Sequence, residues 1–172
     1  MSNPLDDPMS NPMKNPMSIP VSGEPTLKTI GLPPLEQVGY VFRDLAAAVK
    51  LYDPLFGPFS YMDAVVEGAL YRGKPADVSM KVACGMSGNV EIELIQILWG
   101  ASPHQEFIDR GREGMHHVRF RADDCDRWVE KMAPLGYQPI WYKAWPELGN
   151  CKCAYLERPG DPMIVEFFER SW

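Results

Sequence analysis

The stretch LEQVGYVFRD at residues 35–44 is repeated in outline by MHHVRFRADD at residues 115–124. Each stretch begins with β-branched and aromatic residues in alternation, which is typical of a strand. Each ends at an aspartate, a residue type that caps the start of a helix. The chain therefore contains a weak internal repeat, and that repeat decides the fold class.

Two markers support the repeat when Gln37 is aligned with His117. The capping aspartates Asp44 and Asp124 both lie seven residues after the aligned position. Glycines that end the two helices follow twenty and nineteen residues after it, at positions 57 and 136. Agreement of both spacings within one residue indicates two copies of one unit.

Each predicted helix is followed by three predicted strands. They are Phe59–Val66, Ala76–Ala83 and Val90–Leu98 in the first copy, and Tyr137–Tyr142, Cys151–Leu156 and Met163–Phe168 in the second. The order is therefore βαβββ twice, an α+β fold. Module one spans residues 35–100 and module two spans 115–169. The linker 101–114 begins with Ser102-Pro-His-Gln105, a pattern that predicts a short helix over Pro103–Arg110.

The first 34 residues differ from the rest of the chain. They contain eight of the 17 prolines and show no hydrophobic periodicity, so we expect an extended leader before a domain at 35–172. The leader is either a flexible tail or an arm that binds a partner. It lacks the apolar core of a secretory signal, which predicts a cytoplasmic protein with reduced cysteines.

Composition excludes several classes of partner. The 172 residues are 45% hydrophobic, enough for a real core, and carry a net charge of −6. No basic stripe is present to bind nucleic acid, and no apolar run is long enough to span a membrane.

Strand alternation selects the candidate site residues. In the first strands, Gln37 and His117 fall on the face opposite the apolar one, with Arg119 beside His117. Glu93 and Glu166 each lie in the last strand of a module, where a carboxylate is costly unless it is paired or metal-bound. The same alternation puts His116 on the opposite face, in a structural role.

These residues resemble those of the vicinal oxygen chelate superfamily, which includes glyoxalases, bleomycin-resistance proteins and dioxygenases. The resemblance covers Leu35 to Glu169. The motifs Ile92-Glu-Leu-Ile-Gln96, Ser102-Pro103 and Gly114-Met-His-His-Val118 are most similar to methylmalonyl-CoA epimerases. The resemblance implies two modules that form a curved mixed sheet around a metal-binding cavity. It also implies that the chain forms a homodimer.

The resemblance also implies a metal site. The ligand positions fall on Gln37, Glu93, His117 and Glu166, a set similar to that of animal-type glyoxalase I. An oxygen-rich set with one imidazole favours a divalent ion such as Zn, Ni, Co, Mn or Mg.

Such a site moves a proton next to a carbonyl group. Glu166 is expected to be a metal ligand and the general base, with Glu93 as a second catalytic carboxylate. Arg119 is expected to bind an anionic group of the substrate, which we expect to be a small acyl thioester or another carbonyl compound.

Some residues depart from the epimerase and glyoxalase patterns. Epimerases use a second carboxylate where this chain has Ser79, with Asp77 nearby, and the arginine pair expected for glutathione is missing. Glu93 could instead form an ion pair with Arg119. A non-catalytic ligand-binding protein of bleomycin-resistance type and a ring-cleaving dioxygenase therefore stay open as alternatives.

Overall fold

The computed structural model describes residues 30–149 and 151–170, so most of the predicted leader at 1–34 lies outside the described residues. Within those ranges the chain forms three α-helices, two short 3-10 turns and eight strands. In chain order the helices and strands are β1 Leu35–Val41, α1 Leu45–Phe56, β2 Ser60–Tyr71, β3 Lys74–Ser87, β4 Val90–Gly100, α2 Pro103–Asp109, β5 Gly114–Ala122, α3 Cys125–Met132, β6 Gln138–Trp145, β7 Cys151–Glu157 and β8 Ile164–Glu169. The order βαβββ therefore occurs twice, and the predicted α+β class is confirmed.

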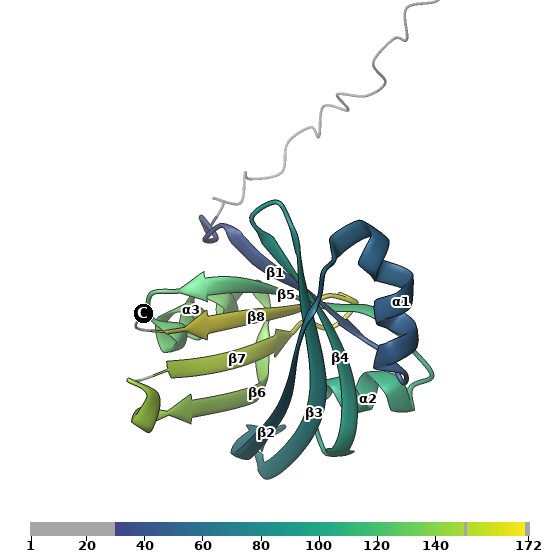
Figure 1. The fold of residues 1–172 in the computed structure, drawn as a ribbon. Helices are drawn as coiled ribbons and strands as arrows, with labels where there is room; N and C mark the ends of the chain where they lie inside the picture. The colour runs from purple at the N-terminus through teal and green to yellow at the C-terminus, as the bar shows by residue number, and fades with distance from the viewer. Residues whose placement is uncertain (1–29, 150, 171–172) are drawn as a thin grey trace, which may run out of the picture.

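The strands form a closed ring in the order β1-β4-β3-β2-β6-β7-β8-β5 (Figure 1). Strand β1 runs parallel to β4, and β5 runs parallel to β8, while all other neighbours are antiparallel. The two modules meet where β1 pairs with β5, so the first and last strands of both modules lie together at the centre of the sheet. Parallel neighbours need a crossover, which α1 and α3 begin.

The ring closes at its shortest joint, which we call the seam. Strands β2 and β6 pair only through Leu70 with Tyr142 and Tyr71 with Trp141. Every other pair of neighbouring strands aligns over at least five residues. The ring is therefore complete but is joined weakly on the side opposite the β1–β5 pair.

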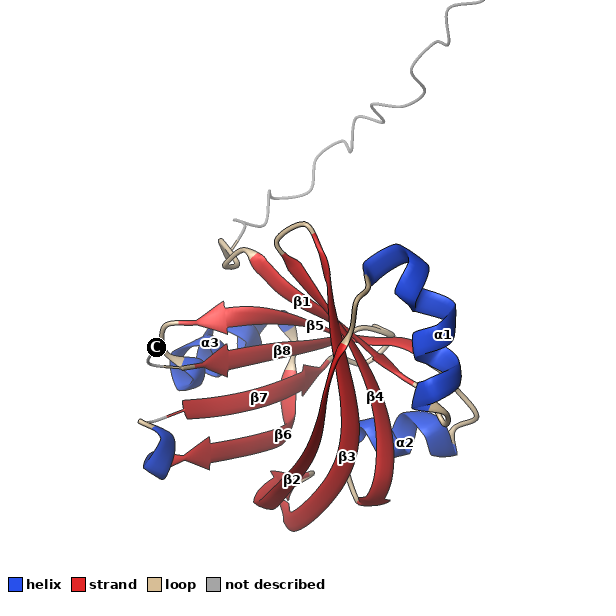
Figure 2. Ribbon diagram, viewed as in Figure 1, coloured by secondary structure: helices blue, strands red, loops and turns tan. Residues whose placement is uncertain are grey.

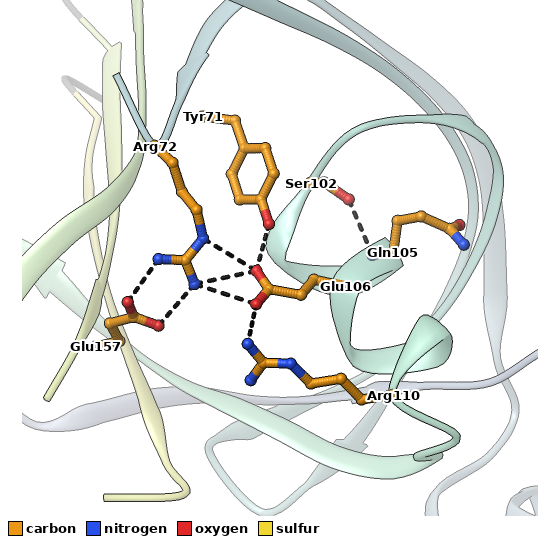
Figure 3. A network of polar contacts seen from close by, with 7 residues as sticks. All are labelled: Tyr71, Arg72, Ser102, Gln105, Glu106, Arg110 and Glu157. Carbon is orange, nitrogen blue, oxygen red and sulfur yellow. Dashed lines mark hydrogen bonds and ion pairs between the residues drawn. The ribbon is translucent and has the colours of Figure 1, made fainter. Parts of the chain in front are cut away.

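Arg72, in the turn between β2 and β3, stabilises the seam through ion pairs (Figure 3). Its guanidinium donates to both carboxylate oxygens of Glu157 at the end of β7, at 2.7 and 2.9 Å. It also donates to Glu106 of α2, which accepts further hydrogen bonds from Tyr71 and Arg110. One side chain thus ties module one to module two and to the linker helix.

Local signals account for the two crossover helices. The Asp44 carboxylate accepts a hydrogen bond from the backbone N–H of Ala47, and that of Asp124 accepts one from Arg127, so both predicted caps are confirmed. A 3-10 turn, Ala133–Leu135, continues α3, and Gly136 follows it at a φ of +86°, a conformation that favours glycine. The hairpin of β2 and β3 is longer than predicted, because a bulge between Val66 and Ala69 lets pairing continue to the turn.

Each of these two helices covers the outer face of its own half of the sheet (Figure 2). Under α1, Leu45 and Val49 pack against Leu94 of β4. Under α3, Trp128 stacks on Phe167 of β8 with ring centroids 5.3 Å apart. Burial of these apolar faces stabilises both modules and leaves the inner face of the ring for the site.

None of the helices within the described ranges has the length and apolarity needed to cross a membrane. The four cysteines at positions 84, 125, 151 and 153 are free thiols, as predicted.

Candidate metal centre

The four predicted ligands lie on the four central strands of the ring. Gly39 of β1 pairs with Glu93 of β4 on one side and with His117 of β5 on the other. Gln37 lies two residues before Gly39 and so shares its face. Strand β8 runs beside β5 and carries Glu166. Segments far apart in the sequence therefore place these side chains in one region.

His117 is the centre of this region. Its side chain is fully buried, and its Nε2 atom lies 3.2 Å from Oε2 of Glu166 and 3.6 Å from Oε2 of Glu93. The Glu166 side chain is 5% exposed and the Glu93 side chain is 15% exposed. Solvent therefore reaches the centre from the Glu93 side.

Gly39 makes room for the imidazole. A Cβ atom at this position would lie 1.9 Å from Cε1 and 2.3 Å from Nε2 of His117, far inside van der Waals contact. The ring of His117 therefore lies directly over the backbone of β1. Only glycine allows this approach.

Three of the predicted ligand atoms are buried without a hydrogen-bond partner: Oε1 of Gln37, Nε2 of His117 and Oε2 of Glu166. The 3.2 Å contact between Nε2 of His117 and Oε2 of Glu166 is an ion-pair contact, and neither atom has a further partner. Buried polar atoms are rarely left unpaired, because each costs about 1–3 kcal/mol. An unpaired imidazole nitrogen and two unpaired oxygens are the donors that a divalent metal ion takes.

The separations also fit a shared ion. Two donors at about 2.0–2.2 Å from one ion lie about 3.0–3.6 Å apart. The distances from Nε2 of His117 to the carboxylates of Glu166 and Glu93 are 3.2 and 3.6 Å. Two carboxylates balance the charge of a divalent ion. The residues present therefore fit the metal that the resemblance implies.

A chain of polar contacts orients Gln37. Its Nε2 atom donates to Oε1 of Glu91 at 2.6 Å, which leaves Oε1 of Gln37 as the atom available to a metal. Arg119 donates to the same Glu91 oxygen at 3.0 Å and to Glu36 at 3.1 Å. Arg119 thus pairs with Glu91 and Glu36 rather than with Glu93, and through Glu91 it helps to orient the predicted ligand Gln37.

The two central carboxylates have opposite pKa shifts. Burial raises the pKa of Glu93 to about 7, and attraction to His117 offsets this only in part. Burial also pushes the pKa of Glu166 upward, but the contact with His117 and the nearby Arg119 charge outweigh it, so this pKa is lowered. The Cys153 thiol donates a hydrogen bond to Oε1 of Glu166 at 3.3 Å, which also lowers the pKa of Glu166. Glu166 is therefore ionised at neutral pH, whereas Glu93 is present in both its protonated and its ionised form near pH 7.

A second group of imidazoles lies behind His117. Nitrogens of His104, His116 and His117 all lie within 4.8 Å of one another, and Nδ1 of His116 is 3.0 Å from Nδ1 of His117. The prediction that His116 faces away from His117 is wrong. Strand β5 bulges there, because Gly39 pairs with His117 while Tyr40 pairs with Met115, which leaves His116 without a partner in β1.

His104 is a residue that sequence reasoning missed. It lies in the first turn of α2, where the motif Ser102-Pro-His-Gln105 predicted only the helix start. Its ring packs edge-on against Tyr155 at 5.2 Å and is 4% exposed. No local pattern signals this burial, which depends on how α2 docks.

The three-histidine cluster could also hold a metal, but it suits a reacting ion less well. Burial lowers the pKa of His116 to about 3 and that of His104 well below its ordinary value, so both rings are neutral. The cluster contains no carboxylate and is sealed from solvent. His104 and His116 therefore serve best as partners that hold the ring of His117.

Neither candidate for a second base on β3 reaches the centre. Cys84 pairs with Glu93 and shares its face, and alternation places Ser79 on the outer face. The Asp77 carboxylate instead accepts a hydrogen bond from the N–H of Gly68 at 2.7 Å, within the bulge of β2.

Comparisons with known proteins agree with this architecture. The family model of the Glyoxalase/Bleomycin resistance protein/Dioxygenase superfamily matches residues 36–155, which include Gln37, Glu93 and His117. No curated protein matches the chain.

Several solved structures share the fold. The hypothetical protein BH1468 from Bacillus halodurans is 20% identical with a TM-score of 0.56, and the match covers 81% of this chain and 95% of that one. Methylmalonyl-CoA epimerase from Mycobacterium tuberculosis is 18% identical with a TM-score of 0.57, over 82% and 90% of the two chains.

A variant of the methylmalonyl-CoA epimerase from Streptomyces coelicolor, solved in complex with 2-nitronate-propionyl-CoA, is 19% identical with a TM-score of 0.54, over 82% and 96% of the two chains. At these identities the likeness shows the fold alone. The family model covers more than half of the chain, and the predicted resemblance is confirmed. This chain belongs to the Glyoxalase/Bleomycin resistance protein/Dioxygenase superfamily, that is, the vicinal oxygen chelate fold.

Proposed function

We propose that this chain is a divalent-metal-dependent isomerase or lyase that moves a proton at the carbon next to a carbonyl group. One observation carries the proposal: Glu93 and Glu166 approach the buried Nε2 of His117 from different strands, with pKa values shifted in opposite directions. A pair of carboxyl groups separated in this way provides an acid and a base at one pH.

In this proposal Gln37, Glu93, His117 and Glu166 hold the metal ion. When bound, the ion supplies Lewis-acid stabilisation of the negative charge that develops on a carbonyl oxygen. Nothing in the donor set distinguishes Zn, Ni, Co, Mn and Mg, since all accept oxygen donors with one imidazole.

The two carboxylates divide the proton transfer. Ionised Glu166 takes the proton from the carbon next to the carbonyl group, and the electron pair of the broken C–H bond moves to the carbonyl oxygen. Glu93 acts in its protonated form, in which it would not hold the ion: it takes up a proton from solvent, to which its side chain is partly open, and returns that proton to carbon. Glu166 then gives the proton that it took to solvent, which resets both groups. Strands β4 and β8 flank the β1–β5 pair, so the two groups reach the substrate from separate sides. Glu93 thus replaces the carboxylate that Ser79 and Asp77 do not supply.

The substrate that we propose is a small carbonyl compound with an anionic group, such as an acyl thioester with a carboxylate. Arg119, whose side chain is 12% exposed, is the proposed partner of that anionic group. Glu36 and Glu91 already pair with Arg119, so the anion must displace one of them. Structural neighbours are epimerases solved with an acyl-CoA analogue, which makes an acyl-CoA the first substrate to test. We expect the catalytic unit to be residues 35–172, acting as a cytoplasmic homodimer.

The test is exchange of substrate protons with solvent deuterium. Methylmalonyl-CoA and the hemithioacetal of methylglyoxal with glutathione are incubated in D₂O with the protein loaded with each candidate metal. Exchange into either compound is expected with the unmodified chain and is lost with Glu166→Gln, because the amide cannot accept the proton. Glu130→Gln, an exposed position on α3, is the matched control and keeps the rate.

Two results would contradict the proposal. Exchange that survives Glu166→Gln would remove the assigned base. A chain that binds the metal but exchanges neither compound would favour the ligand-binding members of the superfamily instead.

A further inference from the structure

The two carboxylate oxygens of Glu166 have different neighbours. Oε2 lies 3.2 Å from Nε2 of His117 and has no hydrogen-bond partner among the residues that the structure describes. Oε1 instead accepts a hydrogen bond from the thiol of Cys153 at 3.3 Å. The last bond of a glutamate side chain rotates over a broad range of angles, so either oxygen could face His117. The contact with Cys153 therefore distinguishes one oxygen from the other.

The pairing of β7 with β8 places the thiol beside Glu166. Tyr155 of β7 is paired with Glu166 of β8. Cys153 lies two residues before Tyr155 and shares its face, at a diagonal position from which a side chain still reaches Glu166. The ring of Tyr155 also packs edge-on against that of His117, with centroids 5.1 Å apart. Strand β7 thus contacts two predicted ligands although it carries none.

The thiol of Cys153 is the donor in this contact. An ionised carboxylate only accepts hydrogen bonds, whereas a thiol carries one hydrogen. Cys153 is 5% exposed and belongs to an apolar cluster that includes Ile140 and Trp141. Within the described ranges, Oε1 of Glu166 is the one acceptor that this thiol contacts. The apolar surroundings therefore keep its hydrogen directed at Glu166.

Two other buried thiols near β8 show that burial alone does not produce such a contact. Cys151, two residues earlier in β7, is 2% exposed, and the charged groups that act on it are Arg170 and Glu169 rather than Glu166. Cys125 donates to the backbone carbonyl of Phe167 at 3.6 Å. Cys153 is the thiol that meets a predicted ligand side chain.

We infer that Cys153 is a positioning residue of the metal centre. Its thiol holds Oε1 of Glu166, so Oε2 is the oxygen turned toward His117, the ion and the substrate. The inference rests on the proposed function, in which Glu166 is a metal ligand and the base. A carboxylate held at one oxygen binds an ion through the other oxygen alone, which leaves a position on the ion open for substrate.

The test removes the thiol and then restores a donor. Cys153→Ala and Cys153→Ser lose the same sulfur atom, but the serine hydroxyl can still donate to Oε1 of Glu166. Calorimetric titration of the full chain with Zn²⁺ measures the affinity, and circular dichroism checks the fold. Cys153→Ala should weaken the affinity about tenfold, because a thiol is a weak donor among the partners that orient metal ligands, and Cys153→Ser should regain most of the loss. Cys151→Ala, the same change on the same strand, is the matched control and should keep the affinity.

A second measurement needs neither ion nor substrate. The infrared S–H stretching band that is lost in Cys153→Ala belongs to the thiol that contacts Glu166. This band should shift in Glu166→Gln, because a neutral amide oxygen is a weaker acceptor than a carboxylate. The same band in Cys151→Ala should stay where it is in the unmodified chain.

Three results would overturn the inference. The first is an unchanged Zn²⁺ affinity in Cys153→Ala, and the second is an equal loss in Cys153→Ala and Cys153→Ser, which would show an effect of packing. The third is an S–H band that does not respond to Glu166→Gln. The proposed function fails by a different result, a metal-loaded chain that exchanges no substrate proton, so the two failures can be told apart.

Discussion

The two modules of the ring have the same order of elements, the same capping aspartates and a helix on the same outer face, yet their equivalent site residues differ in chemistry. In module two, His117 and Glu166 are buried, and the pKa of Glu166 is lowered by the contact with His117. In module one, Gln37 is neutral, Glu93 is partly open to solvent, and burial raises the pKa of Glu93 to about 7. Duplication of the βαβββ topology thus provides equivalent positions in the two modules, whereas the residues around each position set its charge and pKa.

The largest expected effect tests whether the two carboxylates are functionally different. With saturating metal, Glu166→Gln should abolish both exchange and turnover. Glu93→Gln should keep exchange, because Glu166 still removes the proton from carbon. It should lower turnover about 10²–10⁴-fold, because the acid that returns a proton to carbon is lost. Deuterium exchange and product formation are measured on the same samples.

Equal loss of exchange in both variants would show that the modules contribute equivalent groups. Turnover by Glu93→Gln at the unmodified rate would remove its role as the acid.

A smaller effect is expected from the contact between the modules at Gly39. Gly39→Ala places a methyl group in the ring of His117, which must shift, so the affinity for the divalent ion should fall about 10–100-fold. Calorimetric titration with Zn²⁺ or Ni²⁺ measures the change. Gly73→Ala, in the β2–β3 turn at a φ of +77° with no neighbour within 4 Å, controls for backbone strain and should keep the affinity. Unchanged affinity in Gly39→Ala would mean that His117 is not a ligand.

The smallest expected effect is the pH dependence that Glu93 adds to the affinity for the metal ion. Its pKa is raised to about 7, so below this pH a metal ion must displace a proton from it. Affinity should therefore rise about tenfold per pH unit up to pH 7 on account of this group and then level off. Titrations of the unmodified chain and of Glu93→Gln at several pH values isolate this contribution. Parallel pH profiles would show that Glu93 does not bind the ion.

Local patterns predicted most of the fold because its strands and helices follow from near neighbours in sequence. Asp44 and Asp124 cap their helices by hydrogen bonds within three residues, and strand alternation placed Gln37 and His117 on the inner face. Glu93 and Glu166 were candidates because each is a carboxylate in the last strand of its module, and only the family resemblance implied that they meet.

The features that sequence reasoning missed depend on pairing between distant segments. The bulge that turns His116 inward arises from the register between β5 and β1, and register is not encoded by alternation alone. Burial of His104 depends on where α2 docks. The partners of Arg119 are Glu36 and Glu91, which lie on different strands, so its ion pairs required the ring to be assembled.

The seam is the place where the width of the ring depends on the fewest contacts between strands. Strands β2 and β6 share two residue pairs, and Arg72 reinforces them through carboxylates that are partly exposed. We expect substitutions at the seam to alter how far the two modules spread without touching Gln37, Glu93, His117 and Glu166 on the opposite wall. A fold with one strong joint and one weak joint can therefore evolve to admit molecules of new size while the residues of the candidate site stay in place.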